Sequence, residues 1–295
     1  MTLLLENHRL KITIEEPGRI YQGSRFDRSG NITQVILDGK TTFCTTEKSV
    51  NFDGRFHGQG LYNEFGINIP VGYDDCKTGN TFLKIGVGLL TRTGDGPYDF
   101  FASYPVKPFD VEVGQGDNFI RFNVKPEDCR GYAVNMVKTI TLEDNSVHID
   151  YLLQNTGTRA ICTNEYCHNF ISFNHLNIDE HYSLNTSGII PGLSDMIEAV
   201  NPESACSIGN GQLSFNFTPA KDIFFSPFAL FSGPGMWELT HRNFGTAVCE
   251  QTDFTPIIMN VWGTKHVLSP ELFVDINISP GHSQKWRRTF KFYSY

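Results

Sequence analysis

The chain has 295 residues, of which 40% are hydrophobic and 19% are charged, so it has enough apolar material for a large core and too little charge for disorder. Its 32 acidic and 24 basic residues give a formal charge of −8, which does not fit a nucleic-acid-binding protein. No apolar run is long and unbroken enough to span a membrane, and the first residues show no signal-peptide pattern. Seven scattered cysteines without a Cys-x-x-Cys pair favour reduced thiols, so we expect a cytoplasmic protein.

In chain order, the first segment with chemical character is residues 54–65, which we predict to be a glycine-rich loop. It holds His57 and Glu64 together with an asparagine, a glutamine and several aromatic residues. Aromatic rings stack on the C–H faces of sugars while planar polar groups bind hydroxyls, so the loop is a candidate sugar-binding element. An ordinary solvated loop would have the same composition.

The next elements all have the period of strands. Apolar and polar residues alternate along 118–124, and a hairpin is predicted over 138–155 with its turn at 143–146. The same alternation recurs in three later stretches, residues 213–217, 273–278 and 286–293. A helical turn or two is predicted only at 193–200. The pattern predicts a single all-β domain over residues 1–295, an antiparallel sandwich with little helix.

Residues 164–170 follow the hairpin and carry the best candidate for proton transfer. In a strand, His168 and Tyr166 share one face, and an imidazole titrates near neutral pH. A core histidine bound to a backbone group fits the same spacing. A metal site formed by His168, His175 and His181 matches no common zinc motif, and we expect no metal.

A second candidate position lies near the end of the chain. Glu271 comes just before the alternating stretch 273–278, and the start of a strand can hold a side chain rigidly. Asp275 shares a strand face with Glu271, so the two carboxylates compete for the role of a base. Both also fit solvated positions on a sheet surface.

The order of these segments resembles that of the aldose 1-epimerase (galactose mutarotase-like) superfamily, in an uncharacterised branch. The matching features are Asn155-Thr156-Gly157, then His168-Asn169-Phe170, then Glu271, the Pro280-Gly281 turn and the aromatic-rich segment 286–293. Residues 23–30, which include Arg25, lie where the superfamily has an early strand with an arginine. His57-Gly58-Gln59 meets the superfamily's first-histidine motif only loosely.

The resemblance implies a β-supersandwich with large antiparallel sheets and an enzyme that interconverts the α and β anomers of an aldose. It implies Glu271 as the base and His168 as the acid, and no cofactor. The residues implied to hold sugar hydroxyls are His57, Arg25, Glu64 and Asp275. The implied partner is a small carbohydrate, and the protein is expected to be a monomer or a homodimer.

Two alternatives share this fold. One is a non-catalytic carbohydrate-binding protein, because fold does not determine activity. The other is an epimerase for a phosphorylated sugar, which needs a basic cluster in the cleft. The candidate basic residues for that cluster are Arg25, Arg28, Arg55 and Lys84.

Overall fold

The computed structural model describes residues 2–295 and consists almost entirely of antiparallel strands, with 52% of residues in strands and 4% in helix. The helical residues form four short 3-10 turns, η1 (Phe173–His175), η2 (Leu193–Asp195), η3 (Pro202–Ser204) and η4 (Arg242–Phe244). The prediction of an all-β fold with little helix is therefore confirmed.

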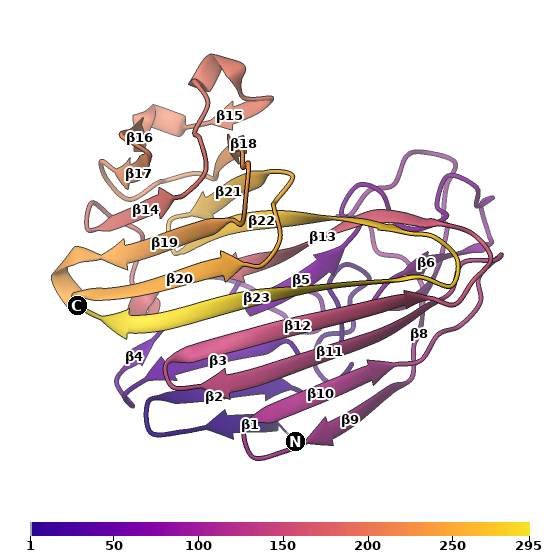
Figure 1. The fold of residues 1–295 in the computed structure, drawn as a ribbon. Helices are drawn as coiled ribbons and strands as arrows, with labels where there is room; N and C mark the ends of the chain where they lie inside the picture. Colours follow the sequence, from indigo (N-terminus) through magenta and orange to yellow (C-terminus); the bar gives the residue numbers. More distant parts are fainter. Residues whose placement is uncertain (1) are drawn as a thin grey trace.

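The first sheet is built around the strands that carry the candidate site residues. Its order is β1 (Thr2–Glu6), β2 (Leu10–Glu15), β3 (Ile32–Leu37), β5 (Gly60–Phe65), β13 (Ile161–Phe170), β22 (Val267–Ile278), β21 (Met259–Thr264), β18 (Ile223–Ala229) and β15 (Glu198–Val200), with β4 (Thr41–Thr42) beside β3. Strands β5, β13 and β22 lie at its centre (Figure 1).

The second sheet also has ten strands and packs face to face on the first (Figure 1). Its order is β16 (Cys206–Gly209), β17 (Gln212–Phe215), β14 (Tyr182–Thr186), β19 (Met236–His241), β20 (Thr246–Thr252), β23 (Ser283–Ser294), β12 (Ser146–Asn155), β11 (Val134–Glu143), β10 (Phe119–Val124) and β9 (Val111–Gln115). A small third sheet consists of β6 (Thr81–Lys84), β7 (Gly88–Thr91) and β8 (Val106–Pro108).

The predicted hairpin is strands β11 and β12, which pair in register from Val134 with Asn155 to Glu143 with Ser146. Every second residue of both strands is buried, because one face of the pair packs on the first sheet and the other does not. Asp144 has a φ of 48° in the turn, a conformation that aspartate tolerates better than most residues. The strands predicted near 118–124, 213–217, 273–278 and 286–293 are present as β10, β17, β22 and β23.

Two local predictions were right only in part. Residues 198–200 form strand β15 rather than a helix, and only the 3-10 turn η2 precedes it. The second half of segment 54–65 is the central strand β5 and not a loop. Gly60 marks the entry to this strand because a Cβ there would lie 2.1 Å from the carbonyl oxygen of Ile32, so the glycine allows the backbones to approach.

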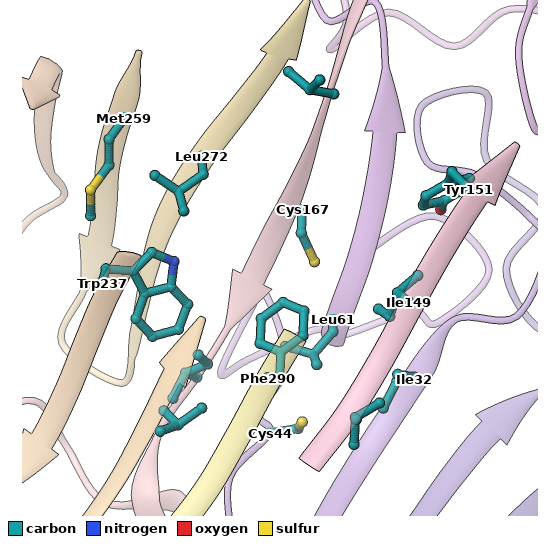
Figure 2. Packing of buried hydrophobic residues seen from close by; sticks show 14 of the residues in the cluster. Ile32, Cys44, Leu61, Ile149, Tyr151, Cys167, Trp237, Met259, Leu272 and Phe290 are labelled. Carbon is teal, nitrogen blue, oxygen red and sulfur yellow. The ribbon is translucent and has the colours of Figure 1, made fainter. Parts of the chain in front are cut away.

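The hydrophobic core lies between the two ten-stranded sheets. Figure 2 shows Leu61, Cys167 and Leu272 from the first sheet near Ile149 and Phe290 from the second. All five side chains are at most 1% exposed. Because side chains alternate along a strand, the residues directly before and after Leu61, Cys167 and Leu272 point to the opposite face of the first sheet.

A chain of buried ionic groups runs through this core. Arg288 on β23 binds Glu165 on β13 at 2.7 Å and Glu250 on β20 at 2.6 Å. Glu165 also accepts a hydrogen bond from the side-chain amide of Asn63. The Oδ1 atom of the same amide accepts a hydrogen bond from Lys138. All five side chains are completely buried. The guanidinium therefore compensates two carboxylates that have no access to water.

We expect Arg288→Met to lower the free energy of unfolding by about 3–5 kcal/mol, because two buried carboxylates would lose their cationic partner. The neighbouring variant Arg287→Met is the matched control, since Arg287 pairs with Asp150 at an exposed position and should change stability by less than about 1 kcal/mol. Urea unfolding followed by circular dichroism measures both. Equal losses in the two variants would contradict a special role for the buried network.

Candidate active site

The candidate residues gather on the face of the first sheet that points away from the core. Tyr166 and His168 flank the core residue Cys167 on β13, and Glu271 precedes the core residue Leu272 on β22. Strands β13 and β22 are direct neighbours, so their outward side chains come together although they are about a hundred residues apart in sequence. The prediction placed Glu271 just before a strand, whereas it lies inside β22.

His168 and Glu271, here called the His168–Glu271 pair, are held together by a serine. The imidazole Nε2 lies 3.5 Å from Oε1 of Glu271. Ser269 Oγ lies 3.0 Å from His168 Nδ1 and donates a hydrogen bond of 2.9 Å to Glu271 Oε1. The same hydroxyl accepts the backbone N–H of Asn169 at 2.8 Å. The serine thus fixes both members of the pair relative to the backbone of β13.

Burial sets the protonation of the pair. His168 is 5% exposed and Glu271 is 4% exposed. Loss of hydration raises the pKa of Glu271 to about 8, an effect that the Ser269 hydrogen bond and the charge of Arg25 only partly offset. Burial, assisted by the positive charge of Arg25, lowers the pKa of His168 well below its usual value. At neutral pH the pair is a carboxylic acid beside a neutral imidazole.

Aromatic rings surround the imidazole and exclude water. The ring of His168 stacks on Phe170 with a centroid distance of 4.1 Å and an interplanar angle of 10°. Trp262 on β21 and Phe26 meet the imidazole edge to face at 5.3 Å and 5.9 Å. In this apolar setting the imidazole is rigid, and hydrogen bonds to it are strong because the local dielectric is low.

A second group of polar side chains lies beside the pair. It consists of Arg25, Glu64, Tyr166 and Lys84 and is called here the Arg25 cluster. Glu64 on β5 binds Arg25 Nε at 2.7 Å, the Tyr166 hydroxyl at 2.7 Å and Lys84 Nζ at 3.2 Å. Arg25 also donates to the Tyr166 hydroxyl at 2.9 Å. Burial alone would raise the pKa of Glu64, but the two cations outweigh it and lower that pKa.

The structure does not bring all six predicted site residues together. His168, Glu271, Arg25 and Glu64 form one neighbourhood, as described above. Asp275 is exposed and stands four residues along β22 from Glu271, which is about 13 Å on an extended strand. His57 is half-buried, and its Nδ1 accepts the backbone N–H of Asp53 at 3.0 Å. The sequence-based assignments of substrate contacts to His57 and Asp275 remain predictions.

Three residues of the site were missed from the sequence. Ser269 precedes Glu271 by two residues, so in a strand the two side chains share one face. Pro270 lies between them, however, and a proline argues against a strand. Trp262 and Asn260 lie on β21. The residue between them faces the core, so both side chains are on the face that carries the site. Asn260 pairs in register with Glu271, and its buried Oδ1 has no hydrogen-bond partner within the described chain. No sequence signal pointed to β21.

A separate hollow of about 630 Å³ opens at the other end of β13. Its lining includes Tyr73, Tyr98, Asp74 and Cys162, and it includes neither member of the His168–Glu271 pair. Tyr98 stands between this hollow and the Arg25 cluster, because Lys84 Nζ lies 5.1 Å from the centre of its ring. We place the chemistry at the pair and not at the hollow, because the pair is a buried carboxyl beside a buried imidazole whose pKa values are shifted in opposite directions.

Among residues 2–295, no group of three or more His, Cys, Asp or Glu side chains is placed to hold a metal ion. In the same range, no helix is sufficiently long and apolar to cross a membrane.

Comparison with solved structures identifies the architecture. A Synechocystis protein aligns over 100% of this chain and 96% of its own, with a TM-score of 0.63 and 14% identity. A galactose mutarotase related enzyme from Lactobacillus acidophilus aligns over 100% and 98%, with a TM-score of 0.60 and 12% identity. The GalM/aldose epimerase homologue from C. elegans aligns over 100% and 99%, with a TM-score of 0.54 and 10% identity.

At these identities the likeness concerns the fold, and this chain has the galactose mutarotase-like fold that its sequence predicted. No protein-family model matches the sequence. No curated protein matches it either.

Proposed function

We propose that the protein is a mutarotase that interconverts the α and β anomers of a neutral aldose. The observation that carries the proposal is the His168–Glu271 pair, a carboxyl and an imidazole 3.5 Å apart in an apolar site. Environments that shift two neighbouring pKa values in opposite directions are typical of acid–base catalysis. The galactose mutarotase-like fold supports this chemistry by likeness.

Mutarotation needs two proton transfers on one C–O bond. Glu271 removes the proton of the anomeric hydroxyl, and His168 protonates the ring oxygen, so that the ring opens. Rotation about the bond between C1 and C2 then presents the other face of the aldehyde, and reversal of both transfers closes the ring. Asn260 Oδ1, buried beside Glu271 without a partner, is available to accept a hydrogen bond from a sugar hydroxyl.

The charge arrangement favours a neutral sugar over a phosphorylated one. Arg25 and Lys84 are both bound to Glu64, and Arg55 is bound to Asp53 at 2.7 Å. Arg28 donates its hydrogen bonds to the backbone carbonyls of Gln22 and Gly23. A phosphate would have to displace these partners, because each of the four basic candidates already has one.

The proposal extends to the remaining properties of the protein. We propose a cytoplasmic location, which fits seven cysteines that are all free thiols, six of them buried. A single domain and a monomer or homodimer remain predictions. A binding protein without catalysis is the outcome to be distinguished from the proposal, because the site's rings and polar groups suit sugar binding alone.

Polarimetry tests the function. Freshly dissolved α-D-glucose, α-D-galactose and other neutral aldoses should reach anomeric equilibrium faster with the protein than without it, and sugar phosphates should gain less. A protein boiled before use controls for buffer catalysis. Stabilisation by sugars in a thermal-shift assay without any acceleration would support the binding protein instead.

We also expect sugar binding at the pair to change the fluorescence of Trp262. This tryptophan lies 5.3 Å from the His168 ring and is half-buried, whereas Trp237 and Trp286 are 0% and 2% exposed in the core. A titration with a neutral aldose should shift the emission of the wild type and leave that of Trp262→Phe unchanged. A shift that persists in Trp262→Phe would place the sugar away from the pair.

A further inference from the structure

The link between the two members of the pair is the hydroxyl of Ser269. At 3.5 Å, the direct contact between His168 Nε2 and Glu271 Oε1 exceeds normal hydrogen-bond length, whereas both groups lie within 3.0 Å of Ser269 Oγ. We propose that Ser269 relays a proton between Glu271 and His168 during mutarotation. It acts through the pair as a positioning and relay residue. This inference rests on the proposed function and names a further residue that the reaction requires.

A count of donors and acceptors shows one complete arrangement of hydrogen bonds. A serine hydroxyl has one proton to donate and two lone pairs that accept. In the first arrangement, Oγ accepts from the backbone N–H of Asn169 and from protonated Oε1 of Glu271. Its own proton is donated to Nδ1 of His168, and the imidazole carries its proton on Nε2. Every polar atom around Oγ then has a partner.

A second arrangement is equally complete. Here Oγ accepts from the same N–H of Asn169 and from His168 Nδ1–H, and it donates to Oε1 of Glu271. Glu271 carries its proton on Oε2, for which the structure shows no hydrogen bond, and His168 Nε2 is bare. The two arrangements contain the same hydrogen-bonded atoms and differ only in where the protons reside.

Ring opening converts the first arrangement into the second with all atoms balanced. The sugar O1–H proton moves to Glu271 Oε2, and the Oε1–H proton moves to Ser269 Oγ. The Oγ–H proton moves to His168 Nδ1, and the Nε2–H proton moves to the sugar ring oxygen. The C1–O bond to the ring breaks as the C1=O1 bond forms. Ring closure on the other face of the aldehyde reverses every transfer.

The relay explains how a buried site that excludes water performs acid–base chemistry. Without it, the roles of Glu271 as base and His168 as acid require a carboxylate beside an imidazolium, and burial disfavours both charged forms. With it, the pair is neutral before and after each step, so no buried charge has to be created. The relay also returns the site to its starting state, because closure runs the same path backwards.

Ser269→Ala and Ser269→Thr form the decisive comparison, because threonine keeps the hydroxyl. We expect Ser269→Ala to reduce kcat by at least about a hundredfold and Ser269→Thr to stay within about tenfold of the wild type. Circular dichroism and urea unfolding check that both variants are folded. Rates in mixtures of light and heavy water should bow away from a straight line for the wild type, because several protons move together, and should become linear for Ser269→Ala.

A second measurement does not depend on activity. When Glu271 is ionised, Ser269 donates to the carboxylate and so lowers the pKa of Glu271; removal of the hydroxyl should raise that pKa further, as followed by carbon NMR of labelled glutamate. Full activity and an unchanged isotope curve in Ser269→Ala would overturn the relay and leave the mutarotase function intact. An unchanged Glu271 pKa would overturn the hydrogen bond itself. A wild type that accelerates no aldose would instead overturn the proposed function.

Discussion

Glu271→Gln and His168→Asn are each expected to slow mutarotation by about a hundred- to ten-thousand-fold, the usual contribution of a positioned proton-transfer group. Each change keeps the size and polarity of the side chain and removes its capacity to take up or release a proton. Because the pKa of Glu271 is raised to about 8, the native carboxyl is protonated at neutral pH, and glutamine imitates its neutral form. Both variants should therefore fold normally. Polarimetry measures the rate, and thermal unfolding measures the fold.

Asp275→Asn is the matched control for the carboxylate. Asp275 shares a strand and a face with Glu271 but is exposed, about 13 Å further along β22. This distance argues against the substrate contact that the resemblance implied for Asp275, so its replacement should leave the rate of mutarotation within about twofold of the wild type. If Asp275→Asn abolished turnover and Glu271→Gln did not, the base would be Asp275 and the site would have to be moved along the sheet.

The sequence revealed most of the fold because periodicity is a local property. Alternation along 138–155 predicted the hairpin of β11 and β12, since each strand buries one face on the opposite sheet. Where the local signal was mixed, the prediction was wrong. Residues 54–65 contain three glycines and were assigned to a loop, but Gly60 serves the close approach of β5 to β3. The strand itself is defined by tertiary packing.

The site was predictable only in part, for a similar reason. His168 and Tyr166 were correctly placed on one face of a strand because their spacing is two. The contact of Glu271 with His168 depends on the register of β22 on β13, which no local pattern encodes. Ser269 was hidden by Pro270, which lies in a strand interior although proline is rare there. Burial, and with it the reversal of the expected protonation, is visible only in three dimensions.

Activity is expected to stay constant near neutral pH and to fall about tenfold per unit as the pH rises beyond about 8. The relay needs the proton that Glu271 carries on Oε1 in the empty site. That proton is lost as the pH passes the Glu271 pKa of about 8, and Ser269 then has no replacement for the proton it passes to His168, so the imidazole cannot give its Nε2 proton to the ring oxygen and stay neutral. An unperturbed imidazole acid would instead lose activity near its ordinary pKa of about 6.5.

The acid side of the profile depends on the imidazole. Protonation of His168 at Nδ1 removes the acceptor for the Ser269 proton, but the pKa of His168 is well below the usual value, so this decline should begin well below pH 6.5. Two charged groups act on the pair. Arg25 opposes protonation of His168 and favours ionisation of Glu271, whereas Glu64 opposes ionisation of Glu271. Mutarotation rates from pH 4 to 10, corrected for buffer catalysis, measure both limbs. A rate that already falls between pH 6 and 7 would mean that His168 starts as the charged acid and that the neutral pair is not the active form.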